Sequence, residues 1–511
     1  MQPPPFVLNC LGTPRLLTAG GQEVRIKVKK HLAVLVILAV DGGKIRRERL
    51  VSMLWPTARP DRARGSVATA ISVLRAKLGS DAIEPGRDWV QLSRRALRLD
   101  VDRLIGGNVL GDDFTPALEV DAFLAGFDIG QSSEFDNWKE RQHARLLPSV
   151  EKALISLADH ARRSGDLNNL GLFAERLLSI DDLSEAGIQA RMEAYALSGD
   201  RITAIRTYED WSRRLRNELN AVPGRKLEDL ANRLRRFGVA HTPSDTILHT
   251  AQTEQWRNQH FVGRTREYRN LTAAWERSDQ NAQHLLMLGD SGVGKTTLVD
   301  RFATAVALQG ATVARTRCFE LESSIPYAMI GSIVQALLNS PGAAATSPRA
   351  LSELSCLVPA VRRRFQDLPA QPEMAGESAR LRFAEAALEY FETLSEERHV
   401  LVTVDDINLS DEASIAVLHL ILRRTRGARI MFVLTWRDTA FDSRDELTRL
   451  RSCHEELGLQ LVTVEPLSPD ACDTLFDLLA SELGASPTTS QRRGLIRCAG
   501  GLPLALELFA S

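Results

Sequence analysis

Hydrophobic and polar positions follow three different patterns along this chain of 511 residues. In the first hundred residues short apolar runs lie between helical stripes, and residues 62–78 place apolar side chains at i, i+4, i+7 and i+11. Residues 138–237 are helical in pattern with short breaks. Residues 285–288, 400–404 and 430–435 are apolar runs of the kind that forms buried parallel strands. We therefore expect three regions of different fold.

The first region is predicted to be a winged helix-turn-helix. Apolar spacing predicts helices over residues 29–40, 46–55 and 62–78, and strands at 89–92 and 97–99 predict a β-hairpin after them. Three helices followed by a hairpin are typical of a winged DNA-binding fold. Ahead of the helices, a small antiparallel sheet is predicted from segments 6–11, 16–17 and 24–28.

Residues 62–78 form the candidate recognition helix. The face opposite the apolar stripe carries hydroxyl and guanidinium groups, which suit base edges and phosphates in a major groove. The tip of the predicted hairpin adds two arginines for a backbone phosphate or the minor groove. An ordinary amphipathic surface helix is the alternative explanation. The candidate DNA-contacting residues are Arg62, Arg64, Ser66, Thr69, Ser72, Arg75, Lys77, Arg94 and Arg95.

The charge distribution favours a polyanion as the partner of this region. Residues 1–104 hold 19 Lys and Arg against 9 Asp and Glu, and the remainder holds 45 against 56. The net charge of −1 therefore joins a basic segment of +10 to an acidic segment of −11. A solvated basic face would explain the charge alone, but the charge together with the helix order favours double-stranded DNA.

The middle region is predicted to be a stack of helix pairs. Its breaks at Gly165 and Gly199 are 34 residues apart, which is the tetratricopeptide period. Such pairs share a core with their neighbours and leave a concave face. The aromatic residues of this region are best explained as core packing, and we assign no site to them.

The third region contains a phosphate-binding loop of the form G-x-x-x-x-G-K-[ST] between an apolar run and a helical pattern. Glycines there let the backbone wrap a phosphate, and the N–H groups at the start of the following helix face the anion. Lys295 is expected to reach the β- and γ-phosphates, and the Thr296 hydroxyl to hold Mg²⁺. The candidate nucleotide-binding residues of the loop are Gly289, Asp290, Ser291, Gly292, Val293, Gly294, Lys295, Thr296 and Thr297.

Two acidic residues follow a buried strand about 110 residues later, in the Walker B arrangement. Asp405 is predicted to hold Mg²⁺, and Asp406 to polarise the attacking water. Arg437, at the end of the next apolar run, is a candidate sensor of the γ-phosphate, with a surface arginine as the alternative. The predicted catalytic set is Asp406, Lys295 and Arg437.

The first two regions resemble SARP-type bacterial transcriptional activators. The resemblance rests on residues 30–40, 47–55 and 64–79 in the winged helix, and on residues 218–223 before a last helix at 225–237. It implies a bacterial transcriptional activation domain after the winged helix. It also implies contact with RNA polymerase or self-association.

The third region resembles the STAND class of signal-transducing ATPases in the AAA+ superfamily. The resemblance rests on residues 262–264, the phosphate loop, the paired acids, residues 435–437 and residues 501–505. It implies that Arg264 lies near the adenine and that Pro503 closes the base pocket from a helical lid at 467–511. Relatives often have His or Gln followed by Trp after the paired acids, so Asn408-Leu409-Ser410 predicts altered water positioning and at most a slow ATPase.

Composition adds the expected compartment. The apolar runs are too short for a membrane span, the N-terminus lacks a secretory pattern, and the six cysteines show no C-x-x-C spacing. These features predict a cytoplasmic protein with reduced thiols.

The predicted organisation is multidomain α/β. A winged helix (1–104) is followed by a tetratricopeptide-like activation domain (105–238), a linker (239–258) and a P-loop ATPase domain (259–511). The class usually continues with further domains, so we expect the natural chain to extend beyond Ser511.

The predicted function is transcriptional regulation, with DNA binding or assembly controlled by ATP or ADP together with Mg²⁺. Self-association on ATP binding and contact with RNA polymerase are the expected partner interactions, and no membrane is expected. One alternative is an ATP-dependent scaffold whose basic N-terminus binds a protein. Another is constitutive DNA binding with a purely structural nucleotide site.

Overall fold

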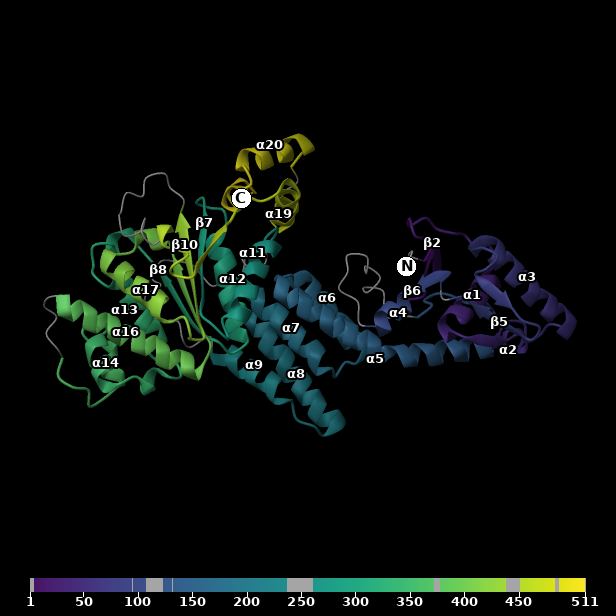
Figure 1. Cartoon of the computed structure of the whole chain (residues 1–511), viewed down its shortest axis with the longest axis horizontal. Coiled ribbons are helices and arrows are strands. Elements are labelled where there is room, and N and C mark those ends of the chain that lie inside the picture. The colour runs from purple at the N-terminus through teal and green to yellow at the C-terminus, as the bar shows by residue number, and fades with distance from the viewer. Residues whose placement is uncertain are drawn as a thin grey trace. The chain divides into compact units, whose positions relative to one another are not determined.

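The computed structural model describes residues 4–93, 95–106, 123–130, 132–236, 261–371, 377–437, 451–482 and 487–510 (Figure 1). The chain divides into two compact units. The first unit comprises residues 1–161 and 168–190, and the second comprises residues 162–167 and 191–511. The predicted linker, 239–258, and most of the connector after the winged helix lie outside the described residues. No described helix is long and apolar enough to cross a membrane.

The predicted winged helix is present in the first unit. Helices α1 (Lys29–Asp41), α2 (Arg47–Leu54) and α3 (Pro60–Leu78) bury their apolar stripes together. Pro60 begins α3 at the first helical position, where its missing N–H is no loss. Beside the helices lies a three-stranded antiparallel sheet in the order β3 (Lys44–Arg46), β5 (Trp89–Leu92), β4 (Ile83–Pro85).

The predicted wing was wrong in its pairing. β5 pairs with β4, and the turn at residues 86–88 joins them, while β6 (Leu97–Leu99) pairs in parallel with β1 (Phe6–Asn9). The reason is burial: Leu97 and Leu99 are both buried when β6 forms the third strand of the N-terminal sheet. β4 has only three residues and ends in proline, so its sequence carries no alternating pattern that predicts a strand.

The N-terminal sheet also differs from the prediction. Its order is β2 (Arg15–Thr18), β1, β6, so the parallel strand β6 supplies the third strand that residues 24–28 were expected to form. Val24 donates one hydrogen bond to the Leu16 carbonyl, 2.8 Å, but by Val28 the chain is already the N-cap of α1. The short helix α4 (Asp100–Ile105) follows β6 directly.

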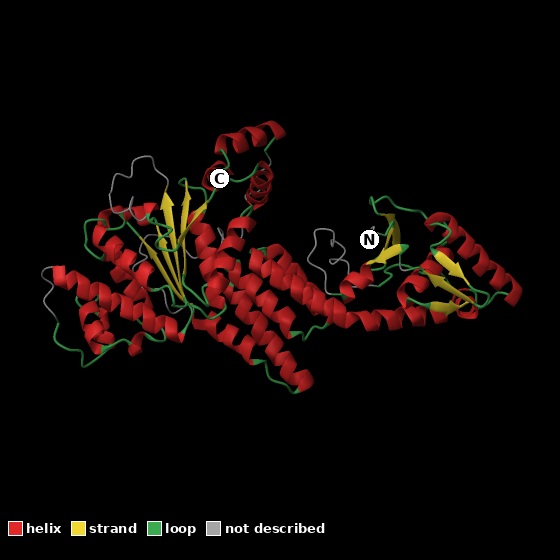
Figure 2. Cartoon of the chain, viewed as in Figure 1, coloured by secondary structure: helices red, strands yellow, loops and turns green. Residues whose placement is uncertain are grey.

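The middle of the chain is helical, with the breaks predicted from sequence (Figure 2). Gly165 and Gly199 both have positive φ, 70° and 89°, which lets the chain leave one helix and start the next. Asp200 caps the next helix by accepting the Thr203 N–H, 3.0 Å. The helices are α5 (Ser133–Ser164), α6 (Leu167–Ile180), α7 (Glu185–Leu197), α8 (Arg201–Leu219) and α9 (Arg225–Arg236).

The rest of the second unit is built on a five-stranded parallel sheet in the order β11-β7-β10-β9-β8. The apolar runs predicted as strands all lie in it and are buried, because helices cover both faces. The order places β7, which leads into the phosphate loop, beside β10 and one strand away from β9. The strands are β7 (Gln283–Gly289), β8 (Thr312–Arg317), β9 (Val400–Asp405), β10 (Ile430–Arg437) and β11 (Leu459–Thr463).

Helices α11 (Thr265–Arg277) and α12 (Lys295–Leu308) contact the sheet strands on one side. The other face is covered by a large apolar cluster that includes Val402, Phe432 and Tyr390. The helices that contribute to this cluster are α13 (Ala328–Leu337), α14 (Pro348–Leu354), α15 (Ala360–Arg364), α16 (Glu377–Glu397) and α17 (Glu412–Arg424).

A separate small core joins the last three helices. α19 (Pro469–Glu482), α20 (Thr489–Ala499) and α21 (Pro503–Ala510) pack around Leu475, Phe476 and Leu506, and Val262 packs against them. This three-helix lid follows β11 directly, so it lies at the carboxyl edge of the sheet, where the phosphate loop begins.

Candidate functional site

The phosphate loop has the strained backbone that its glycines permit. Gly292 and Gly294 have φ of 79° and 97°, a region that other residues rarely adopt. A Cβ on Gly289 would lie 2.7 Å from the Val464 carbonyl oxygen, and one on Gly292 would lie 3.1 Å from Leu504. The glycines therefore let the loop backbone take these positive φ angles and pack closely against Val464 and Leu504, where a side chain would clash.

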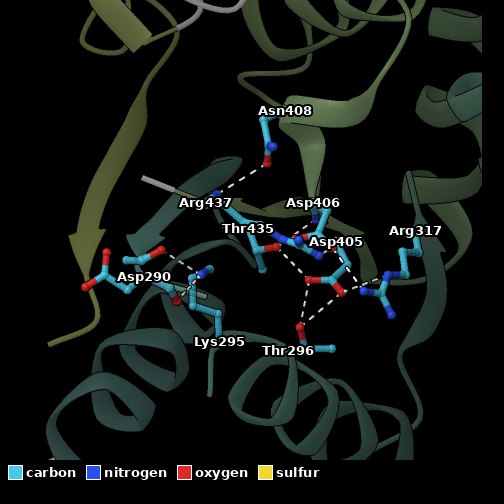
Figure 3. A network of polar contacts seen from close by, with 10 residues as sticks. Asp290, Lys295, Thr296, Arg317, Asp405, Asp406, Asn408, Thr435 and Arg437 are labelled. Carbon is cyan, nitrogen blue, oxygen red and sulfur yellow. Dashed lines mark hydrogen bonds and ion pairs between the residues drawn. The ribbon is translucent and has the colours of Figure 1, made fainter. Parts of the chain in front are cut away.

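Lys295 is the first residue of α12 and is buried, with 6% of its surface exposed. Its Nζ donates to the carbonyl oxygens of Gly289 and Asp290, at 2.7 and 2.9 Å, so the ammonium is held over the loop (Figure 3). Burial lowers the pKa of Lys295, and the charges of Asp406 and Asp405 oppose that effect. A phosphate oxygen arriving in the loop would meet a positive charge already in place.

Asp405 joins the loop to the centre of the sheet. The Thr296 hydroxyl donates to its carboxylate, 3.0 Å from each oxygen, and the Thr435 hydroxyl donates to Oδ1 at 2.6 Å (Figure 3). The parallel pairing of β9 and β10 brings Thr435 beside Asp405, and α12 supplies Thr296. A hydroxyl and a carboxylate are the hard oxygen ligands that Mg²⁺ prefers, so these two side chains fit the metal predicted for them.

Asp406 is buried and is bound by two arginines. Arg437 donates through Nε to Oδ1 at 2.7 Å, and Arg317 donates to Oδ2 at 3.1 Å (Figure 3). Burial raises the pKa of Asp406, but the hydrogen bond and charge of Arg437, with those of Arg317, outweigh it and lower the pKa. Asp406 also has a positive φ of 54°, an outlier for a residue other than glycine. In this arrangement the carboxylate is a weak base.

Arg317 is the site residue that sequence reasoning missed. It ends β8, whose register with β9 sets it opposite Asp405. Its side chain is half-exposed and its Nε lies 3.7 Å from Asp405 Oδ2. No local pattern marked it, because only the pairing of β8 with β9 brings this strand-end cation beside the paired acids.

Arg264 and Pro503 both lie against the phosphate loop. The Arg264 guanidinium is buried and donates to the carbonyl oxygens of Val293 and Glu465, at 2.7 and 2.6 Å. Pro503 Cγ lies 3.8 Å from where a Cβ on Gly294 would be. Leu504 N–H donates to the Gly292 carbonyl oxygen at 3.3 Å. The segment expected to close the base pocket is thus in contact with the loop.

The remaining predicted loop residues lie where the loop turns into α12. Asp290 and Ser291 are exposed, Val293 is fully buried, and Thr297 lies in the first turn of the helix. Asn408, which replaces the expected His or Gln, is buried and its Oδ1 accepts the Arg437 N–H at 3.3 Å. It therefore fixes the backbone that carries Arg437.

In the first unit, the candidate recognition helix α3 presents its polar face to solvent. Arg62, Arg64, Thr69, Ser72 and Lys77 are exposed. Two of the predicted hydroxyls are bonded within the helix, since Ser66 donates to the Arg62 carbonyl and Thr69 to the Gly65 carbonyl, each at 3.0 Å. Neither bond prevents the hydroxyl from accepting another.

Arg75 and Arg47 line a hollow on the same face. Its volume is about 500 Å³, and Ala68, Ile71, Ser72 and Ala76 of α3 also line it. Arg75 Nε donates to the Ser80 carbonyl at 3.0 Å, and Arg47 Nε donates to the Gly86 carbonyl at 3.3 Å. Arg47, at the start of α2, was not predicted as a contact because only the fold brings it to α3.

The changed wing alters which arginine lies at its tip. Residues 86–88 form the β4–β5 turn, so Arg87 is exposed there. Arg95 is also exposed but lies in the connection from β5 to β6, and Arg94 lies outside the described residues. Arg87 was missed because the strand before it was missed.

Comparison with known proteins assigns two domains. Residues 123–235 match the family model described as bacterial transcriptional activator domain, and residues 260–433 match that described as AAA ATPase domain. No curated protein matches the chain.

Two solved structures are similar in part. One is "Mycobacterium tuberculosis EmbR in complex with low affinity phosphopeptide", with 19% identity over 53% of this chain and 70% of that chain, and a TM-score of 0.34. The other is the Walker-type ATPase PABY2304 of Pyrococcus abyssi, with 16% identity over 49% of this chain and 67% of that chain, and a TM-score of 0.33. The two family matches, rather than these distant structures, show that the chain carries a bacterial transcriptional activator domain and an AAA ATPase domain.

Proposed function

We propose that this protein is a DNA-binding transcriptional regulator whose DNA binding or assembly is set by ATP or ADP in the phosphate loop. ATP·Mg²⁺ would be held by Lys295, Thr296 and Asp405, and double-stranded DNA by the exposed face of α3. Contact with RNA polymerase and self-association on ATP binding belong to the same proposal. Hydrolysis would be slow, because Asp406 is held in ion pairs by Arg437 and Arg317.

The observation that carries nucleotide control lies on α12, the helix that begins at the phosphate loop. Arg301, in the middle of α12, is buried, and its guanidinium donates to the Gly165 carbonyl at the first break of the helical region, 2.9 Å. At the end of α12, the Leu308 carbonyl accepts a hydrogen bond from Arg233 of α9, also at 2.9 Å. One helix thus touches both the nucleotide site and the activator domain.

Further packing surrounds the contacts of α12 with the helical region. The Arg301 guanidinium also lies over the Phe261 ring, 4.3 Å from its centroid. A Cβ on Gly165 would lie 2.9 Å from the Tyr268 ring. Breaking the hydrogen bond from Arg301 to Gly165, or that from Arg233 to Leu308, would remove one partner from a guanidinium or from a helix-end carbonyl, which is costly. A shift of α12 on nucleotide exchange would therefore move the helices attached to it, or be resisted by them.

For control to work, ATP must bind the active form more tightly than the inactive form, since equal affinity shifts no population. The test uses the full chain and duplexes selected from a random library, at several salt concentrations, with ADP or with a non-hydrolysable ATP analogue. We expect at least a tenfold difference in DNA affinity between the nucleotides, and a steep loss of affinity with salt. No binding even at low salt would favour the protein-partner alternative.

Two variants separate the remaining possibilities. If Lys295→Ala leaves nucleotide-dependent assembly and transcription unchanged, the nucleotide site is structural and the switch is excluded. Arg233→Ala should bind both nucleotides normally yet lose the difference in DNA affinity between them. Arg236→Ala, on an exposed position of the same helix, is the matched control.

A further inference from the structure

Arg264 is a charged residue in a place that penalises charge. It lies at the N-cap of α11 with 5% of its surface exposed. Burial lowers its pKa, and the nearby Glu267 carboxylate, 3.4 Å away, opposes that shift. A buried guanidinium is tolerated only where its donors are satisfied. The acceptors of its hydrogen bonds therefore identify the segments that Arg264 connects.

The partners of Arg264 come from separate segments of the second unit. Its Nη2 donates to the Val293 carbonyl inside the phosphate loop, at 2.7 Å. Its Nη1 donates to the Glu465 carbonyl, at 2.6 Å, in the connection between β11 and the three-helix lid. The planar guanidinium therefore links the loop to the base of the lid through two fixed backbone oxygens.

The lid touches the loop at neighbouring points as well. A Cβ on Gly263 would lie 2.7 Å from Ala471 Cβ in α19, so this glycine packs directly on the lid. Leu504 donates its N–H to Gly292 of the loop at 3.3 Å. Loop and lid are thus joined at several points, and the Arg264 guanidinium supplies a charged side chain among these contacts.

We infer that Arg264 is a positioning residue that fastens the three-helix lid to the phosphate loop and so sets how slowly a bound nucleotide leaves. The inference rests on the proposed nucleotide site and adds to it a control of nucleotide release. Arg264 acts through the two carbonyls, and its hydrogen bonds do not contribute to recognition of the base. ADP dissociation is therefore the step that its loss accelerates.

The experiment is stopped-flow dissociation of a fluorescent ribose-labelled ADP from the full chain, chased with unlabelled ADP. For Arg264→Gln we expect dissociation at least tenfold faster with association within twofold of the unchanged protein. Arg264→Lys can still donate to one carbonyl, so its dissociation rate should lie between those of the unchanged protein and Arg264→Gln. Arg266→Gln, on an exposed position in the first turn of α11, is the control and should change neither rate.

Competition by pyrophosphate, which has no base, distinguishes fastening from base recognition. Fastening predicts that Arg264→Gln weakens ADP and pyrophosphate by the same factor. Loss of ADP affinity with pyrophosphate affinity kept would overturn the inference in favour of a base contact, and an unchanged dissociation rate would overturn it outright. Failure of the unchanged protein to bind any nucleotide would instead refute the proposed function.

A milder variant tests the inference in case Arg264→Gln does not fold. Glu267→Gln leaves Arg264 in place but removes its carboxylate partner, so the guanidinium is held less firmly. We expect dissociation to be about threefold faster with an unchanged circular dichroism spectrum. If Arg264→Gln is unfolded by that spectrum, the Glu267→Gln rate decides: no acceleration would overturn the inference.

Discussion

Lys295 and Arg62 are both cations predicted to meet a phosphate, but their surroundings differ. Lys295 is buried and bonded to two carbonyls of its own loop, whereas Arg62 is exposed on α3. A buried charge interacts strongly with a few fixed neighbours, while exposed charges act together through a field that salt screens. Single substitutions should therefore be severe in the nucleotide region and mild in the winged region.

The two regions also differ in their buried titratable groups. His284, on β7, is 2% exposed, and burial lowers its pKa to about 4. Asp100, at the start of α4, is 5% exposed, and burial raises its pKa to about 6 although the N–H groups of Leu11, Cys10 and Val101 bond its carboxylate. Folding therefore makes His284 harder to protonate and Asp100 easier to protonate.

The largest expected effect is an opposite response of the two regions to acid. The contribution of neutral, buried His284 to the free energy of unfolding is complete above its unfolded pKa of 6.5 and is lost as the pH falls toward 4. The contribution of Asp100 is complete below its unfolded pKa of 3.8 and is lost as the pH rises through 6. From pH 7.5 to 5 we expect His284 to remove about 2 kcal/mol from the second unit and Asp100 to add about 1 kcal/mol to the first.

Peroxide oxidation of buried methionines in increasing urea measures both units in one sample. Met53 reports on the first unit and Met431 on the second, by mass spectrometry at each pH. His284→Leu should flatten the pH response at Met431 only, and Asp100→Asn that at Met53 only. Parallel responses of both methionines in either variant would contradict the assignment.

The next effect sharpens the contrast at the metal site. Asp405→Asn removes the carboxylate that Thr296 and Thr435 orient, so Mg²⁺ should no longer strengthen ATP binding. We expect the ratio of ATP affinity with Mg²⁺ to that with a chelator to fall about tenfold, or about 1.4 kcal/mol. Titration calorimetry measures both affinities, and Glu412→Gln, an exposed acid on α17, is the control. A ratio that survives in Asp405→Asn would remove Asp405 from the metal site.

The smallest effect tests the corrected wing. Arg87→Ala removes one exposed cation at the β4–β5 turn and should weaken DNA binding by about 0.5–1 kcal/mol, uniformly across sequences, while lowering the salt slope by about 1. Arg95→Ala should change little, because Arg95 lies in the connection to β6. Fluorescence anisotropy at four salt concentrations measures both. A larger loss for Arg95→Ala would restore the hairpin first expected from the sequence.

Much of the nucleotide region was predictable because its chemistry is local. The spacing of Gly289, Gly294 and Lys295 and the buried run before Asp405 specify a loop and a strand end, and parallel pairing then brings them together. Arg437 followed from the same logic. Arg317 did not, because a cation at a strand end has no pattern until the strand order sets it beside Asp406.

The winged region was predictable only as far as its helices. Apolar spacing predicted both ends of α1, α2 and α3 to within two residues. The strand that pairs with Trp89–Leu92, in contrast, depended on where Leu97 and Leu99 are buried. A short strand ending in proline carries no periodic signal. The same limit hid Arg47, which is brought to α3 by packing.

The sequence by itself determined the helices of the winged region, the buried strands at 285–288, 400–404 and 430–435, the phosphate loop, the paired acids and the charge of the first hundred residues, since each depends on neighbours along the chain. The tertiary structure alone decided the wing pairing, the arginine pair on Asp406, and the link from Arg264 to both Val293 and Glu465. Those features join residues far apart in sequence. The energy of such contacts depends on burial and on fixed backbone oxygens, which have no counterpart in a local pattern.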